Sequence, residues 1–311
     1  MAPSRSERPI EQDGRRPSWL PAAEYPFESR FVDLDGHLIH YVDEGSGPTL
    51  LFVVAGAAWS FVFGPVIERL RGHFRCVALD LPGSGLSVPA EGYEPGIEAA
   101  CSVLERFVLE LDLRDVTLVV HDLGGVVALG VAARHPELVR GMTVIETFGW
   151  PISEENPKVA RMLRMVSGRA FRGINGATNV LAGATSTGLG VGRHLSRAGR
   201  KAFRGPFRDR EVRRAALLML RDATVAVAYL RGVDRSLTTT LHDRPLLLVF
   251  GGKSPVRKEG FPDQWTARFP EARLVVVEGA HHFPHMDEPD LVAEAIRSWW
   301  SERVAPPTTA S

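Results

Sequence analysis

The chain has 311 residues, a formal net charge of +0 and 44% hydrophobic residues, which suits one large α/β domain with an inserted subdomain. The balanced charge argues against nucleic acid or a membrane as the main partner, because either would select a net basic surface. Two cysteines, Cys76 and Cys101, lie outside any metal-binding or disulfide pattern and favour a reducing, cytoplasmic location.

The two ends of the chain have the composition of solvated segments. Residues 1–24 are rich in Arg, Ser and Pro and lack the apolar core of a signal peptide, so we expect a disordered leader. Residues 304–311 are predicted to form a disordered tail. No apolar run reaches the roughly 18 residues that a membrane-spanning helix needs.

From Ser29 onward, apolar segments of strand length alternate with helical ones, which predicts a mostly parallel sheet covered on both faces. Segments 31–34 and 37–42 are expected to pair antiparallel across a tight turn at Asp35-Gly36. Continuous runs of apolar and β-branched residues indicate strands that are buried on both faces. Such strands are predicted at 49–54, 75–80, 116–120, 142–146, 245–250 and 273–277, with helices at 66–70, 97–111 and 126–135.

Residues 151–236 depart from this pattern and are helical, interrupted by Gly, and basic. They hold 17 Lys and Arg against 6 Asp and Glu. An insertion of this size between two strands predicts a helical cap on one core domain, which is formed by 25–150 and 237–303. The cations form either a solvated helix face or a surface that attracts an anionic substrate. Gly183 to Gly192 is expected to be a moving lid segment.

A candidate nucleophile follows the strand predicted at 116–120. That strand leads into His-Asp-Leu-Gly-Gly at 121–125, and a helix comes next. This is the form of a nucleophile elbow, in which small residues permit a sharp turn. An aspartate at its centre favours attack at an sp³ carbon, which gives an alkyl ester that water must then hydrolyse. The alternative is that Asp122 is only a helix N-cap.

Two further residues complete a possible catalytic set. His282 follows the last predicted strand, where a general base is expected, with His281 or a purely structural histidine as the alternatives. After the strand at 245–250, where an acid would be expected, the sequence reads Gly-Gly-Lys-Ser. Glu146 ends the strand that follows the elbow helix, so we assign it as the acid that orients His282. A helix N-cap or a buried hydrogen-bonding role is the alternative for Glu146.

Several motifs together resemble bacterial haloalkane dehalogenases and their epoxide hydrolase relatives, namely those at 25–30, 40–45, 59–61, 74–77 and 121–125. The likeness runs from about Glu24 to Trp300. It implies an α/β-hydrolase fold, with a mostly parallel central sheet flanked by helices and an inserted helical cap. It also implies an aspartate nucleophile, a histidine base, a third acidic residue and no cofactor or metal. Glu146 matches the acid of those dehalogenases in which this residue follows the sixth strand.

Two departures from the family concern the leaving-group pocket. The family usually has His-Gly-Asn-Pro or His-Gly-Glu-Pro after the third strand, whereas Val-Ala-Gly-Ala stands here, so the polar halide-binding side chain becomes Gly56. The second halide donor, a Trp after the nucleophile, is Leu123 here. Losing one such donor typically costs about 2.7–4 kcal/mol of transition-state stabilisation. Trp59 and Trp150 are candidate replacements, and backbone amides near Gly56 and Leu123 remain available to an oxyanion.

The sequence therefore predicts a hydrolase that acts on a small molecule at an sp³ carbon through Asp122, Glu146 and His282. Epoxide opening, or tailoring of a natural-product scaffold, is the alternative among enzymes. Epoxide hydrolase relatives commonly use two lid tyrosines as proton donors, and Tyr229 is the single tyrosine of the predicted cap. A catalytically impaired binding protein is the alternative of a different class. We expect a monomer or a homodimer.

Overall fold

The computed structural model describes residues 16–188 and 190–305. Its centre is an eight-stranded sheet with the order β1-β2-β4-β3-β5-β6-β7-β8. The pairs β1/β2 and β2/β4 are antiparallel, and all other neighbours are parallel. The strands are β1 (Arg30–Leu34), β2 (His37–Glu44), β3 (Thr49–Val54), β4 (Arg75–Asp80), β5 (Val116–His121), β6 (Val139–Ile145), β7 (Leu246–Gly251) and β8 (Arg273–Val277).

Helices cover both faces of this sheet. The helices outside the segment between β6 and β7 are α1 (Gly64–Leu70), α2 (Ile97–Glu110), α3 (Leu123–Arg134), α11 (Pro255–Lys258), α12 (Phe261–Arg268), α13 (Pro284–Asp287) and α14 (Pro289–Arg303), with 3-10 turns η2 (Ser60–Phe63) and η3 (Pro136–Leu138).

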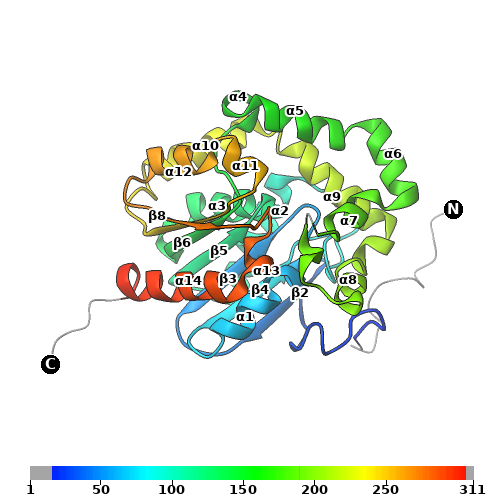
Figure 1. Cartoon of the computed structure of the whole chain (residues 1–311), viewed down its shortest axis with the longest axis horizontal. Coiled ribbons are helices and arrows are strands. Elements are labelled where there is room, and N and C mark those ends of the chain that lie inside the picture. Colours follow the sequence, from blue (N-terminus) through cyan, green and yellow to red (C-terminus); the bar gives the residue numbers. More distant parts are fainter. Residues whose placement is uncertain (1–15, 189, 306–311) are drawn as a thin grey trace.

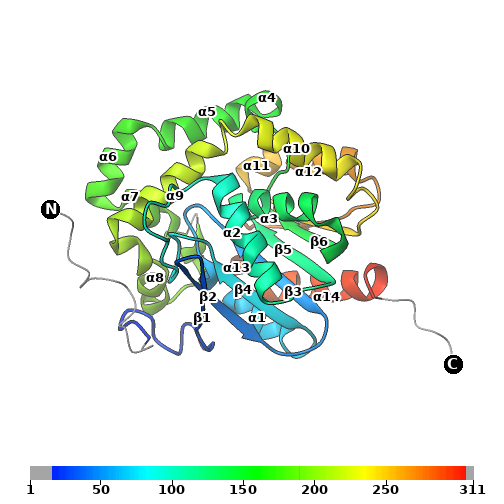
Figure 2. The same cartoon turned by 180° about the vertical axis from the view of Figure 1, so that it is seen from behind.

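The alternation of side chains along β3 shows how the sheet is buried on both sides. Leu51 and Val53 join one apolar cluster, which includes residues of α2, α3 and α12. Leu50, Phe52 and Val54 join a second cluster, which includes residues of α1 and α14. Figures 1 and 2 show these two faces of the sheet. Successive strand residues point to opposite faces, so a wholly apolar strand requires two covering layers.

In the described part of the chain between β6 and β7, the regular elements are helices only. They lie together above the sheet in Figure 1 and form the inserted cap. No helix among the described residues is long and apolar enough to cross a membrane. The cap elements are α4 (Ile152–Glu155), α5 (Pro157–Val166), α6 (Arg169–Thr178), α7 (Val180–Thr185), η4 (Val191–Arg193), α8 (Arg197–Phe203), η5 (Pro206–Arg208), α9 (Arg210–Asp222) and α10 (Val227–Thr238).

The start of α3 differs from the prediction. The helix begins at Leu123 rather than at 126, so both glycines of the elbow motif are helical. A methyl group at Gly124 would overlap the backbone of Val53 and Val54 in β3. The glycines therefore let the helix pack directly against the sheet, a tertiary reason that helix propensity does not contain.

The predicted leader is wrong over residues 16–24, which pack against the domain. Trp19 and Leu20 are buried, and Arg16 donates hydrogen bonds to the carbonyls of Tyr25 and Phe27. Trp19 lies where a side chain at Gly205 would stand, so the cap helps to hold this segment. Residues 1–15 lie outside the described residues.

The predicted tail also begins too early. Val304 is buried, and its carbonyl accepts a hydrogen bond from Arg140 Nε at 2.9 Å. The last turn of α14 is therefore tied to the start of β6, and the folded domain continues beyond residue 303. Residues 306–311 lie outside the described residues.

Candidate active site

Asp122 lies on a sharp turn between β5 and α3. Its φ of 49° and ψ of −135° are strained for a residue with a side chain. The side chain makes no capping hydrogen bond, so Asp122 does not act as a side-chain N-cap. The turn is held through its backbone, because the Asp122 carbonyl accepts hydrogen bonds from Thr147 Oγ1 at 2.6 Å and from the Gly125 N–H at 3.0 Å. The side-chain carboxylate takes no part in holding the turn, and the side chain is 24% exposed.

His282 lies between two carboxylates, in the loop that joins β8 to α13. Its Nε2 is 3.7 Å from Asp122 Oδ2, and its Nδ1 is 3.3 Å from Glu146 Oε2. The neighbouring His281 instead donates its backbone N–H to Asp287. The structure thus brings the three residues assigned from the sequence into one line of contacts, with His282 rather than His281 as the imidazole.

Glu146 is fixed in place by the loop that follows β7. Its own φ is 51°, and its side chain is fully buried. Oε1 accepts the N–H of Gly251 at 2.6 Å, and Oε2 accepts the hydroxyl of Ser254. The Gly-Gly-Lys-Ser segment that lacks the expected acid therefore supplies donors to an acid on the neighbouring strand. Sequence reasoning missed Ser254, although a serine at the site of a missing carboxylate was the available signal.

The two carboxylates change the acidity of His282. Burial lowers the pKa of this imidazole, but hydrogen bonds and charge from Asp122 and then Glu146 outweigh burial and raise the pKa to about 10. The ring is therefore a cation at neutral pH while Asp122 is ionised. Neutralising Asp122 would remove the larger of the two carboxylate contributions, so that more of the imidazole would be in the neutral form that can accept a proton.

This dependence gives a first prediction. In the Asp122→Asn variant, we expect the pKa of His282 to fall below about 10, because burial and Glu146 alone then set it. The measurement is a pH titration of the His282 ring by NMR in both proteins. An unchanged pKa would show that Asp122 and His282 do not interact.

His121 connects the turn at Asp122 to the loop that carries His282. It immediately precedes Asp122, it is fully buried, and its Nε2 lies 2.8 Å from the carbonyl oxygen of His282. A carbonyl only accepts, so His121 must carry its proton on Nε2. Burial, reinforced by His285 and His282, lowers the pKa of His121 well below its usual value, so the ring stays neutral. The turn at Asp122 and the loop that carries His282 are consequently joined by one buried hydrogen bond.

A small, mostly apolar cavity lies near Asp122, and Gly56 is part of its lining. A methyl group at Gly56 would lie 3.3 Å from Asp122 Oδ2. Gly56 has a φ of 85°, which favours glycine at this turn. The lining includes Gly56, Gly83, Ser84, Phe207, Ala216 and Met219, which come from the β3 and β4 loops and from the cap. Such a lining suits a small apolar substrate.

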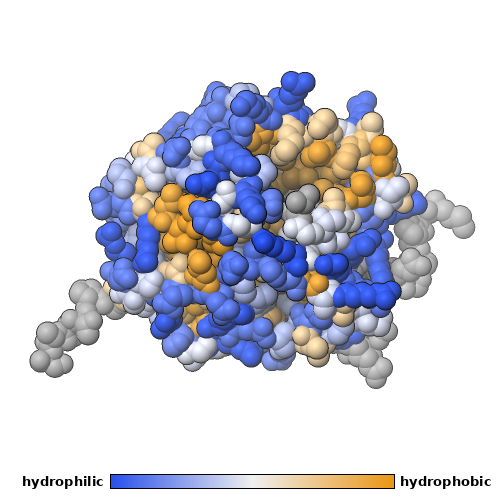
Figure 3. Space-filling model, viewed as in Figure 1, coloured by the Kyte–Doolittle hydropathy of each residue, from blue (hydrophilic) through white to orange (hydrophobic). Residues whose placement is uncertain are grey.

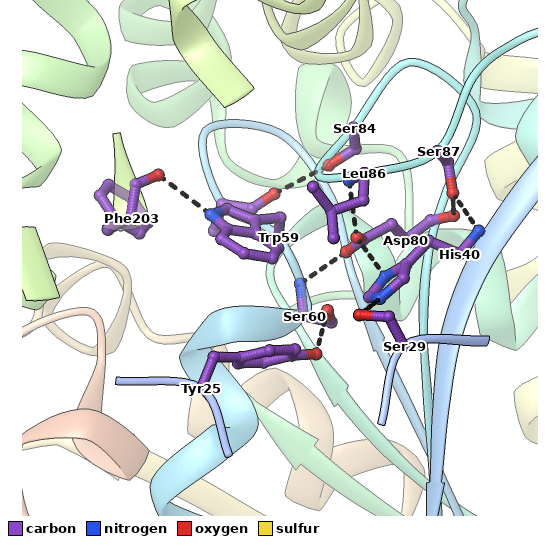
Figure 4. Close-up of polar contacts among 11 residues, drawn as sticks. Tyr25, Ser29, His40, Trp59, Ser60, Asp80, Ser84, Leu86, Ser87 and Phe203 are labelled. Carbon is purple, nitrogen blue, oxygen red and sulfur yellow. Dashed lines mark hydrogen bonds and ion pairs between the residues drawn. The ribbon is translucent and has the colours of Figure 1, made fainter. Parts of the chain in front are cut away.

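A separate, buried serine–histidine–aspartate arrangement connects the loops near this cavity (Figure 4). His40 Nδ1 is 2.8 Å from Asp80 Oδ2, and His40 Nε2 is 3.1 Å from Ser29 Oγ. Asp80 also accepts the backbone N–H groups of Ser60 and Leu86, at 2.8 and 2.9 Å. Both Asp80 and His40 are fully buried, and neither lines the cavity. Asp80 therefore joins the loops after β3 and β4, which is a structural role.

Three residues assigned to the leaving-group pocket have other partners, which corrects that part of the prediction. Trp59 Nε1 donates to the carbonyl of Phe203 at 2.9 Å, as Figure 4 shows, and Trp150 Nε1 donates to Asn156 Oδ1 at 2.8 Å. Both indoles are fully buried. The Tyr229 hydroxyl donates to the carbonyl of Val126 in α3 at 3.2 Å. None of these groups is free to stabilise a leaving group, whereas Gly56 and Leu123 do lie next to Asp122.

Comparison with known proteins agrees with this architecture. The model of the alpha/beta hydrolase fold family matches residues 48–289. Haloalkane dehalogenase 2 of Mycobacterium tuberculosis is 32% identical over 281 residues, which cover 88% of this chain and 94% of that protein. The cis-3-alkyl-4-alkyloxetan-2-one decarboxylase of Shewanella oneidensis is 26% identical over 289 residues, which cover 89% of each. The crystal structure of haloalkane dehalogenase DatA from Agrobacterium tumefaciens superposes with a TM-score of 0.79 at 22% identity and covers 92% of this chain and 100% of that one.

The fold and the family match together show that the chain belongs to the α/β-hydrolase fold family. Within this family it is a haloalkane dehalogenase-like hydrolase. The family resemblance expected from the sequence is confirmed.

Proposed function

We propose that the protein hydrolyses a bond at an sp³ carbon through a covalent ester on Asp122. The observation that carries this proposal is the arrangement of Asp122, His282 and Glu146, with contacts of 3.7 and 3.3 Å along the line. Asp122 is the only one of the two carboxylates that is accessible, because its side chain is 24% exposed and that of Glu146 is fully buried. Asp122 is thus the nucleophile and Glu146 the orienting acid.

In the first step, an oxygen of Asp122 attacks the carbon and expels the leaving group with its bonding electron pair. The products are a neutral alkyl ester and a leaving anion. Loss of the Asp122 charge lowers the pKa of His282 from about 10, and the imidazolium then releases its proton to solvent.

In the second step, the neutral Nε2 of His282 takes a proton from water, which attacks the ester carbonyl. The bond between the carbonyl carbon and the alkyl-bearing oxygen then breaks. The alcohol leaves with the Asp122 oxygen that had attacked the substrate carbon, and Asp122 returns to a carboxylate. Glu146 stabilises the imidazolium that forms, because its Oε2 faces Nδ1. Backbone amides near Gly56 and Leu123 would stabilise the tetrahedral oxyanion, which requires no side chain.

Halide departure is the first candidate, because several related enzymes are named haloalkane dehalogenases. The second candidate is the opening of a strained ring that contains oxygen. The hydrogen-bond donors of the predicted leaving-group pocket favour this candidate. Gly56 and Leu123 offer no side-chain donor, and the N–H groups of Trp59 and Trp150 are already bonded elsewhere. The Shewanella relative is named for an oxetan-2-one, whose opening at its sp³ carbon releases a carboxylate that spreads its charge over two oxygens.

A substrate panel separates these candidates. Purified protein would be incubated with chloro-, bromo- and iodoalkanes and with dialkyl oxetan-2-ones, and halide and ring-opened products would be quantified. Halide release would support dehalogenation, and ring opening without halide release would support the second candidate. Turnover of neither class would contradict the proposed enzymatic function.

A further inference from the structure

The part of the cap that contains α5 to α8 has an unusual charge. Residues 156–208 include 11 Lys and Arg and no Asp or Glu over 53 consecutive positions. A surface that is merely solvated usually mixes both signs. The balanced charge of the whole chain conceals this segment, and the expectation that a membrane is not a partner rested on that balance.

The four arginines of α5 and α6 have no counter-charge within the described residues, whereas Lys158 of α5 pairs with Glu259. Arg161, Arg164, Arg169 and Arg172 make no ion pair or side-chain hydrogen bond there, whereas Arg214 and Arg231 elsewhere in the cap pair with glutamates. An array of unpaired cations is available to an anionic surface.

Large apolar side chains are exposed among these cations. Met165 is 71% exposed, Ile174 56%, Met162 44% and Val180 39%. Arg164 and Met165 lie three and four residues after Arg161, one turn further along the exposed side of α5. Figure 3 shows apolar side chains gathered over α5 and α6, where the surface is hollowed, beside hydrophilic ones. In Figures 1 and 2, α5 runs along the top of the molecule, and α6 to α8 follow one another down the adjoining side.

We propose that this cap face, defined by the exposed residues of α5 to α8, docks on a membrane surface that carries anionic phospholipids. Arginines would bind the headgroup phosphates, while Met162, Met165 and Ile174 would enter the boundary with the acyl chains. Nucleic acid would match the cations but would leave these apolar side chains exposed.

Docking would also serve substrate entry. The helices α5 and α6 pack against α9, and α9 contributes Ala216 and Met219 to the apolar lining beside Gly56. An apolar molecule that partitions into the bilayer would therefore lie next to the helices that cover the cavity. The docking itself does not depend on the proposed catalytic chemistry.

The test is co-sedimentation of the full chain with vesicles. We expect binding to mixed phosphatidylcholine and phosphatidylglycerol vesicles that weakens as salt is raised, and little binding to phosphatidylcholine alone. Each arginine near such a surface changes partitioning by about fivefold, so the Arg161→Gln/Arg164→Gln/Arg169→Gln variant should bind about a hundredfold more weakly. The Met165→Ser/Ile174→Ser variant should also bind more weakly.

A matched control removes the same charge elsewhere. The Arg106→Gln/Arg114→Gln/Arg297→Gln variant changes three exposed arginines outside the cap and should retain most of the binding. Absence of binding to anionic vesicles, or equal losses in the two triple variants, would overturn the proposal. So would full binding by Met165→Ser/Ile174→Ser, or binding to an oligonucleotide without binding to vesicles.

Discussion

The Asp122→Asn variant is expected to lose turnover by about 10⁴-fold or more on any substrate that the wild-type protein hydrolyses. An amide oxygen is a far weaker nucleophile than a carboxylate, and no other described carboxylate beside His282 is accessible. Asparagine keeps the size of the side chain and tolerates the φ of 49°, so the fold should be retained. The measurement is the initial rate of product formation, with circular dichroism as the check on folding.

Asp115 provides a matched control, because its backbone adopts the same positive φ as that of Asp122. Its φ is also 49°, and it is exposed on the turn before β5, away from the catalytic contacts. The Asp115→Asn variant should therefore keep wild-type rates. If both variants showed the same activity, a nucleophilic role for Asp122 would be ruled out.

The His282→Gln variant is expected to stop after the first step. Asp122 can still attack carbon, but no general base activates water, and such a base typically contributes about 10²–10⁴-fold. Steady-state turnover should fall by about 10³-fold, while the ester accumulates on the protein. Intact-protein mass spectrometry after mixing with substrate should show a gain equal to the alkyl group.

The neighbouring histidine provides the comparison for this experiment. His281 donates only its backbone N–H to Asp287, so His281→Gln should turn over substrate and carry no adduct. Accumulation in His281→Gln but not in His282→Gln would mean that the base has been assigned to the wrong imidazole.

The strands and the positions of the candidate catalytic residues could be predicted from the sequence, because both depend on the local order of residues. A continuous apolar run such as that of β3 can only be buried on both faces. The elbow follows β5, the acid follows β6 and the histidine follows β8, and these three strands belong to the same parallel part of the sheet. Parallel strands end at the same edge of the sheet, so residues far apart in sequence meet there.

The partners of buried polar groups were not accessible in this way. The indole of Trp59 bonds a carbonyl 144 positions away, and nothing local predicts that contact. Trp19 is buried because Gly205 of the cap leaves room for it, so composition alone misjudged the leader. The donors of Glu146 likewise come from a loop about a hundred residues later. Such pairings depend on tertiary packing, which sequence pattern does not encode position by position.

A single turnover in water enriched in the heavy oxygen isotope tests the covalent ester most directly. Protein in excess over substrate would be digested after one turnover. The mass of the peptide that contains Asp122 would then be measured by mass spectrometry. If water attacks the ester carbonyl, that peptide gains one heavy oxygen and the alcohol product carries none. Heavy oxygen in the alcohol, with an unlabelled peptide, would mean that water attacks the substrate directly and would contradict the account.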